Sequence, residues 1–197
     1  IQPIGDWVLR EVCRLLRRWQ AQGLPRIPIA VNLSARQFKQ ANFIESVAEA
    51  LAETGIEPQL IELELTESML MKDIQQTTAK LKELKAMGFS ISVDDFGTGF
   101  SSLNYLRHFP IDVLKIDQSF VREIFDDDAA LAIIDSIIAL ANALRMRTIA
   151  EGVETLAQQE MLQQHGCDTL QGYLIARPLP EAEFIQWLQD HHASAQC

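Results

Sequence analysis

FSISVDDFGTG, residues 89–99, opens with a short apolar run that ends on two aspartates and continues into a glycine-rich loop. Five further apolar runs end on polar or charged residues and lead into helical patterns. They are IPIAVN (27–32), LIELELTE (60–67), IDVLKID (111–117), MRTIAEGVE (146–154) and CDTLQGY (167–173). This spacing fits one strand, one helix and two short loops per unit. The repeat predicts an α/β fold of the TIM-type (β/α)8 barrel class.

The barrel is expected to be incomplete. The chain of 197 residues shows six such runs, whereas a full barrel has eight strands and usually about 250 residues. The sequence opens at Ile1 without a methionine and runs directly into an amphipathic helical pattern. We therefore predict one barrel domain over residues 1–197 that lacks its first strands. The strand edges exposed in this way would favour association.

Composition limits the partners and the compartment. A formal net charge of −10 argues against binding to long nucleic acids, whereas a small anion held through metal ions remains compatible. Three cysteines without Cys-x-x-Cys spacing disfavour a disulfide framework and a zinc site. No membrane insertion or signal peptide is predicted. We expect a cytoplasmic location, which includes the cytosolic part of a larger, membrane-anchored protein.

Side-chain alternation sorts the strand residues into two faces. The apolar parity, which includes Leu63, Leu65, Ile91 and Val93, suits packing against outer helices. The other parity carries polar residues, and the carboxyl ends of parallel barrel strands meet at one face, where active sites are built. We therefore expect these residues to converge: Asn32, Glu64, Asp94, Lys115, Glu151 and Gln171. Helical patterns are predicted at 43–53, 69–87, 129–144, 156–165 and 181–190.

Carboxylate and amide oxygens at one barrel mouth are the ligands that Mg²⁺ or Mn²⁺ prefers. Several unpaired acids would repel one another, which favours a bound cation. The adjacent Asp94 and Asp95 could bridge two ions about 3.5 to 4 Å apart, a geometry suited to hydrolysis of a phosphodiester. The alternative is a set of solvated acids that pair with Lys115.

Lys115 has two possible roles. A lysine on a barrel strand can be a Schiff-base nucleophile. Nearby acids raise the pKa of a lysine and keep it protonated, which opposes that role. We therefore interpret Lys115 as a cation that positions a water or a substrate oxygen.

Together these residues resemble the EAL domain, a phosphodiesterase family that hydrolyses the bacterial second messenger cyclic di-GMP. The resemblance covers essentially the whole chain. Its motifs are Asn32-Leu33-Ser34, Glu64-Leu65-Thr66-Glu67, Asp94-Asp95-Phe96-Gly97-Thr98-Gly99, Lys115-Ile116-Asp117, Glu151-Gly152-Val153-Glu154 and Gln171-Gly172-Tyr173. The resemblance implies dependence on Mg²⁺ or Mn²⁺, with two ions, and opening of cyclic di-GMP to linear pGpG.

By position, the resemblance also implies residue roles. Asn32, Glu64 and Asp94 match the family's ligands of one metal ion. Asp94 and Asp95 match the pair that links this ion to a second one. Glu151 matches a general base or a second-metal ligand, and Lys115 matches the residue that orients the nucleophilic water. The substrate side of the pocket corresponds to Asp117, Glu154 and Gln171.

The loop at 96–102 carries a further implied role. Glu67 is similar to the glutamate that anchors this loop, in which Gly97 and Gly99 permit unusual backbone shapes. In the family this loop couples metal binding to dimer contacts, so the resemblance implies a homodimer. The alternative interpretation of Gly97 and Gly99 is a plain tight turn without a regulatory role.

One departure from the family pattern concerns activity. The Glu-Ala-Leu motif that names the family, whose glutamate is a further metal ligand, does not occur in this sequence. A molecule that began at Ile1 would therefore be weakly active or inactive. The family also implies fusion to upstream sensory or GGDEF-type domains. A cyclic di-GMP-binding receptor is the rival interpretation, and an unrelated metal-dependent barrel enzyme is a third.

Overall fold

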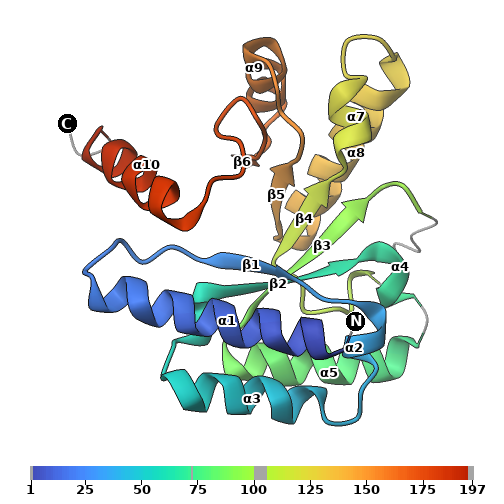
Figure 1. Cartoon of the computed structure of the whole chain (residues 1–197). Coiled ribbons are helices and arrows are strands. Elements are labelled where there is room, and N and C mark those ends of the chain that lie inside the picture. Colours follow the sequence, from blue (N-terminus) through green and yellow to red (C-terminus); the bar gives the residue numbers. More distant parts are fainter. Residues whose placement is uncertain (1, 72, 100–105, 195–197) are drawn as a thin grey trace.

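The computed structural model describes residues 2–71, 73–99 and 106–194. Within them, parallel strands form one six-stranded sheet in chain order, which curves into a half-barrel (Figure 1). The strands are β1 (Ile29–Asn32), β2 (Ile61–Thr66), β3 (Ser90–Phe96), β4 (Val113–Ile116), β5 (Arg147–Ala150) and β6 (Thr169–Leu170). The predicted α/β barrel class with about six strands is confirmed.

Helices separate the strands. They are α1 (Gln2–Ala21), α2 (Ala35–Phe38), α3 (Phe43–Thr54), the 3-10 turn η1 (Pro58–Leu60), α4 (Glu67–Leu70), α5 (Ile74–Met87), α7 (Gln118–Arg122), α8 (Asp128–Leu144), α9 (Leu156–Gln164) and α10 (Glu181–Ser194). Four of the five predicted helices are present with ends shifted by up to four residues.

The prediction of a single helix over 69–87 is wrong. Helix α4 is one short turn that ends at Leu70, and α5 begins at Ile74. The side chain of Asp73 accepts a hydrogen bond from the backbone N–H of Gln76 at 3.2 Å, so it caps a new helix. An aspartate in this position favours a helix start over a helix interior.

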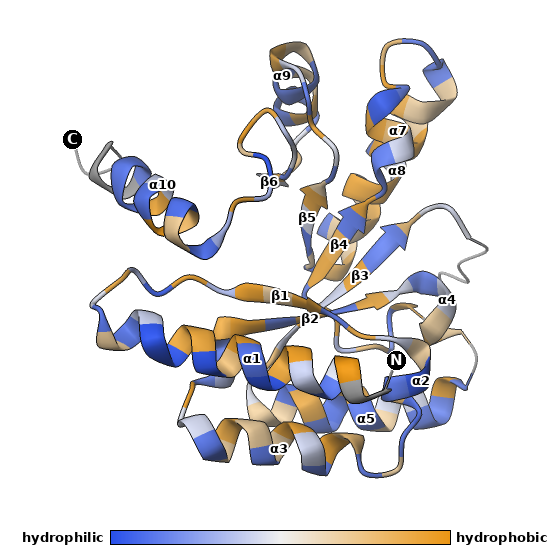
Figure 2. Cartoon of the chain, viewed as in Figure 1, coloured by the Kyte–Doolittle hydropathy of each residue, from blue (hydrophilic) through white to orange (hydrophobic). Residues whose placement is uncertain are grey.

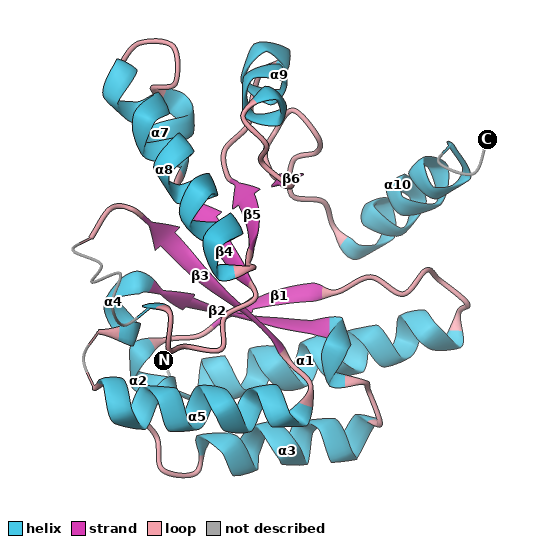
Figure 3. Ribbon diagram, turned by 180° about the vertical axis from the view of Figure 1, so that it is seen from behind, coloured by secondary structure: helices cyan, strands magenta, loops and turns pink. Residues whose placement is uncertain are grey.

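The outer face of the sheet holds the core. Leu63, Leu65, Ile91, Val93 and Leu114 are all fully buried. Seen from behind, helices cover this face (Figure 3), and β3 changes from hydrophobic to hydrophilic toward its carboxyl end (Figure 2). Burying each large aliphatic side chain contributes roughly 1.5 to 3 kcal/mol. The apolar parity therefore fixes which face of each strand turns toward the helices.

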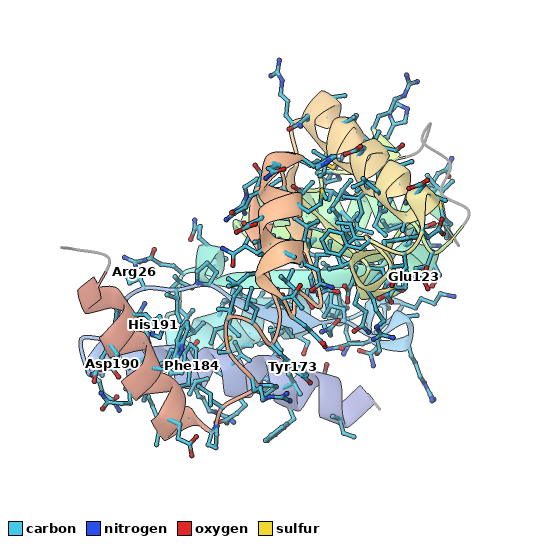
Figure 4. The ribbon with its side chains drawn as sticks, turned by 90° about the horizontal axis from the view of Figure 1, so that it is seen from above. Arg26, Glu123, Tyr173, Phe184, Asp190 and His191 are labelled. Atoms are coloured by element: carbon cyan, nitrogen blue, oxygen red, sulfur yellow. The ribbon has the colours of Figure 1, made fainter. Side chains whose placement is uncertain are left out.

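The inner face is open next to β1. Val31 is buried, whereas its neighbours Ala30 and Asn32 are exposed on the opposite face. Helix α10 returns to the end of α1, where Phe184 stacks on Trp19 with ring centroids 5.4 Å apart and the indole of Trp19 donates to Glu181 at 3.0 Å. Figure 4 shows Phe184 on the side of α10 that faces α1. In the described part of the chain, no helix is both long and apolar enough to cross a membrane.

Candidate active site

Lys115 on β4 lies at the centre of a cluster of carboxylates. Its Nζ is 2.6 Å from Oε1 of Glu64 and 2.6 Å from Oε1 of Glu151, and 3.3 Å from Oδ1 of Asp94. The four residues come from β2, β3, β4 and the end of β5. The lysine side chain is 3% exposed and that of Glu64 is 5% exposed. The strands therefore bring one buried cation into contact with three acids, as the inward parity predicts.

The protonation of this cluster follows from burial and charge. Burial by itself lowers the pKa of Lys115, but hydrogen bonds to Glu151 and Glu64, and their charges, outweigh it and raise that pKa above its ordinary value. Burial raises the pKa of the Glu64 and Glu151 carboxyls, and contact with Lys115 only partly offsets this. Lys115 therefore stays protonated at neutral pH, which opposes a Schiff-base role.

A bulge in β3 explains how two adjacent aspartates reach the same mouth. Val93 pairs with Leu114, whereas Phe96 pairs with Ile116, so β3 contains one more residue than β4 over this span. The extra residue falls at Asp94–Asp95, and Asp95 has a φ of 55°. A bulge re-aims the side chains on either side of it. The left-handed backbone at Asp95 is a strained conformation for a residue with a side chain.

The cluster contains an all-oxygen candidate metal site. Ligand atoms of Asp94, Asp95 and Glu151 all lie within 4.8 Å of one another. Burial and the charge of Asp94 raise the pKa of Asp95. This donor set fits a hard divalent cation, which would relieve the repulsion among the acids. Asn32 ends β1 directly opposite Glu64 in the register of β2, and its exposed side chain lies at the same rim.

The three residues predicted for the substrate side lie in different surroundings. Asp117 follows β4, and its carboxylate accepts a hydrogen bond from the backbone N–H of Ser119 at 2.9 Å as the cap of α7. Glu154 and Gln171 line a cavity of about 440 Å³ together with Glu151. Asp117 does not line this cavity, although its negative charge contributes to raising the pKa of Asp95.

The sequence interpretation assigned no role to three further residues that line this cavity. Gln118 and Arg122 lie four positions apart on α7, and Tyr173 lies on the loop after β6. The ring of Tyr173, which is exposed, lies 4.4 Å from the guanidinium carbon of Arg177. The spacing of Gln118 and Arg122 indicates a shared helix face. Only the packing of α7 against the loop at 151–154, where Gln118 lies close to Gly152, brings that face to the cavity wall.

Glu67 holds the glycine loop that follows β3. Its side chain is buried, and Oε2 accepts a hydrogen bond from the backbone N–H of Gly97 at 3.1 Å. Gly97 has a φ of 98°, and a Cβ at Gly99 would lie 2.5 Å from Oε1 of Glu67. The carboxylate therefore contacts the loop where only glycine fits. Residues 100–102 of the predicted loop lie outside the described residues.

Replacing Glu67 with glutamine should lower the activity of the site. The amide is nearly the same size but is uncharged and presents one acceptor oxygen, so the hydrogen bond to Gly97 weakens and Asp95 loses its fixed position. We expect a fall in turnover of about tenfold with little change in the unfolding temperature. Kinetics and thermal unfolding of the two proteins would check this. A Glu67→Gln protein with unchanged turnover would contradict the anchoring role.

Ser92 lies on β3 two residues before Asp94, opposite Glu64 in the register with β2. Its side chain is fully buried, and its hydroxyl has no hydrogen-bond partner among the described residues. An unsatisfied buried hydroxyl costs about 1 to 3 kcal/mol. Ser92→Ala should therefore leave the protein as stable or make it more stable by about 1 kcal/mol, as measured by denaturant unfolding. A clear loss of stability would show that the hydroxyl has a bound partner, such as an ordered water.

Comparisons with known proteins agree with this arrangement. The chain is 47% identical over 185 residues to the bifunctional diguanylate cyclase/cyclic di-GMP phosphodiesterase MucR of Pseudomonas aeruginosa, which covers 94% of this chain and 27% of that protein. It is 42% identical over 195 residues to the cyclic di-GMP phosphodiesterase NbdA of the same species, over 99% of this chain and 25% of that protein. The chain thus spans about a quarter of the length of these relatives.

Solved structures show the same fold. The MucR phosphodiesterase in complex with cyclic di-GMP superimposes with a TM-score of 0.89 at 47% identity, covering 92% of this chain and 74% of that one. A manganese and cyclic di-GMP complex of BlrP1 from Klebsiella pneumoniae gives a TM-score of 0.77 at 28% identity, covering 88% of this chain and 45% of that one. The profile of the EAL domain matches residues 1–178. With the half-barrel and its acid cluster, these matches show that the chain belongs to the EAL domain family.

Proposed function

We propose that this chain is the larger part of a metal-dependent phosphodiesterase domain that hydrolyses cyclic di-GMP to linear pGpG. The observation that carries the proposal is the placement of Asp94, Asp95 and Glu151 within 4.8 Å of one another beside a buried, protonated Lys115. The names of the relatives and the ligand in the MucR complex support the choice of substrate.

The ligand set is proposed to hold two Mg²⁺ or Mn²⁺ ions. Asn32, Glu64 and Asp94 would hold the first, and Asp94 with Asp95 would link it to the second. The manganese complex of BlrP1 and the dependence of the family on metal support this assignment. When bound, such ions lower the pKa of a water and offset the charge of the phosphodiester.

The other roles in the reaction would belong to side chains of this chain. Lys115 keeps its proton because two carboxylates accept from it at 2.6 Å, so it acts as a fixed donor that orients a water or a phosphate oxygen. Glu151 lines the 440 Å³ cavity and contacts Lys115, and this supports a role in accepting a proton from water or in binding metal. Glu154 and Gln171 would contact the nucleotide from the cavity wall, and Asp117, which follows β4, would border the substrate side of the pocket.

The similarity to these relatives also supports a proposal for the domains that accompany this chain. The relatives are multidomain signalling proteins, and the chain covers about a quarter of them, so we propose fusion to upstream sensory or GGDEF-type domains. We also propose one barrel domain that includes residues 1–197 together with an upstream segment carrying the Glu-Ala-Leu motif. We further propose that the domain forms a homodimer and is located in the cytoplasm.

The test is hydrolysis of cyclic di-GMP by a longer form of the chain that includes the native upstream residues. The assay would follow pGpG by chromatography with Mg²⁺, with Mn²⁺ and with EDTA, beside the chain that begins at Ile1. Metal-dependent pGpG formation by the longer form would support an enzyme. Tight binding without turnover would support the receptor interpretation. The shorter chain should turn over more slowly, because it lacks the upstream glutamate.

A further inference from the structure

A second cavity, of about 340 Å³, lies at the end of the sheet opposite the acid cluster. Its walls come from residues at or just before the amino-terminal ends of β2, β3, β4 and β5. The arrowheads of β3, β4 and β5 point away from this end (Figure 1). It contains none of the residues assigned to the catalytic site, so it is a separate feature of the fold.

The charges that line this cavity are mostly positive. Lys85, Arg145 and Arg147 contribute three cations, and Asp112 is the one acid among the lining residues. This excess stands out because the whole chain carries a net charge of −10. Glu62 lies nearby, where it accepts from the Ser90 hydroxyl at 3.5 Å, but it does not line the cavity.

Lys85 and Asp112 neutralise each other. The lysine Nζ is 2.7 and 2.8 Å from the two oxygens of Asp112 and also donates to the carbonyl of Phe89 at 3.1 Å. One Asp112 oxygen also accepts the backbone N–H of Ile91 at 2.8 Å. This pair therefore joins α5 to the starts of β3 and β4, and it has a structural role.

Arg145 and Arg147 remain without an acid. Both are exposed, and neither makes an ion pair with any residue of the described ranges. Arg145 follows the carboxyl end of α8, where a cation is favoured by the helix dipole. Arg147 lies on β5 and has no helix end to balance. The cavity therefore keeps a net charge of about two positive units.

The backbone at Arg145 gives an independent indication. Helices α3 and α5 end on glycines in the left-handed conformation, Gly55 and Gly88, whereas α8 ends on Arg145 with a φ of 59°. Glycine adopts this conformation without strain, and arginine does not. The residue in this costly conformation is one of the two arginines that line the cavity.

We propose that this cavity binds a phosphate group through Arg145 and Arg147. A guanidinium presents paired N–H donors in a plane that matches two phosphate oxygens, and two arginines match the charge of a phosphate dianion. The side-chain amide of Gln59, which also lines the cavity, supplies a neutral donor. At about 340 Å³ the space exceeds one phosphate, so it also admits part of an attached small molecule.

The experiment is thermal unfolding of the chain in EDTA at constant ionic strength, titrated separately with inorganic phosphate, pyrophosphate and GDP. EDTA removes divalent metal, so the acid cluster repels these anions. We expect a saturable rise in unfolding temperature, and the probe that binds most tightly distinguishes free phosphate from a phosphorylated organic molecule. A matched titration with chloride measures the nonspecific effect of salt.

Three variants make the result specific. Arg145→Gly and Arg147→Gln should each weaken binding at least tenfold, whereas Arg17→Gln, at an exposed position on α1, should not change it. Without ligand, Arg145→Gly should unfold at a higher temperature than the parent, because glycine suits the backbone there. Weaker binding by this folded variant would then reflect loss of the arginine side chain and not loss of the fold. The proposal would be overturned if the phosphate probes raised the unfolding temperature no more than chloride does. It would also be overturned if the rise in unfolding temperature persisted in both Arg145→Gly and Arg147→Gln.

Discussion

Lys115→Met should destabilise the metal-free protein by about 3 to 5 kcal/mol, the usual cost of leaving buried charges without a partner. The substitution removes the cation that lies 2.6 Å from both Glu64 and Glu151 and leaves their carboxylates together with Asp94. Turnover should fall by roughly a hundredfold or more, because the variant loses the donor that we propose for the reacting group. Denaturant unfolding in EDTA and the pGpG assay would measure the two effects.

The pH dependence of this variant follows from the shifted carboxyls. Burial raises the folded-state pKa of Glu64 and Glu151 above the unfolded values, so the stability they contribute is present at acid pH and is lost as pH rises through the folded-state pKa. Without Lys115 to offset the burial, the pKa of both groups should rise further. The stability gap between the variant and the parent should therefore narrow as pH falls from neutral toward 4.

The control for Lys115→Met is Lys82→Met, which removes an exposed lysine from α5. It should change stability by less than about 0.5 kcal/mol and leave turnover unchanged. A Lys115→Met protein as stable as this control would show that the carboxylates are already neutral or separately paired. That result would remove the physical basis for treating Lys115 as a fixed cation.

Asp94→Asn should abolish metal-dependent activity while leaving the fold intact. Asp94 lies in the bulge of β3, where its carboxylate is close to both Asp95 and Glu151. Loss of its charge should weaken Mn²⁺ binding by at least roughly a hundredfold, because even residues that only support a ligand cost 10 to 100-fold when changed. Calorimetric titration with Mn²⁺ and the pGpG assay on the longer form of the chain would check both effects.

Stability in EDTA distinguishes this result from misfolding. Asp94→Asn removes one of several like charges, so the metal-free variant should be at least as stable as the parent. Asp126→Asn, at an exposed position before α8, is the matched control and should keep both metal affinity and turnover. An Asp94→Asn protein with full Mn²⁺ affinity would exclude Asp94 as a ligand and with it the proposed two-ion site.

Sequence periodicity was sufficient for the strands and for the faces they present. The alternation in β2, β3 and β4 predicts that Glu64, Asp94 and Lys115 lie on the face opposite the apolar core, and the buried leucines and isoleucines bear this out. A strand has a period of two, and a buried face admits only one register. Local pattern therefore carries this information without reference to the rest of the chain.

The helix at 69–87 shows where local pattern fails. The apolar spacing continues across Asp73, but the capping hydrogen bond to Gln76 begins a new helix there. A short side-chain acceptor competes with the helix interior for backbone donors, and its geometry decides between the two. Periodicity does not report on that competition.

The sequence by itself determined the half-barrel class, the inward parity and the identity of the acids at the carboxyl ends of the strands. Only the tertiary structure decided how Asp94 and Asp95 share one mouth, because the bulge that re-aims them is defined by pairing with β4. It also decided that Arg122 and Glu151 line one cavity and that Arg145 and Arg147 line another at the opposite end of the sheet. The physical reason is that alternation along one strand is a local property, whereas register between strands and packing of helices depend on contacts between distant segments.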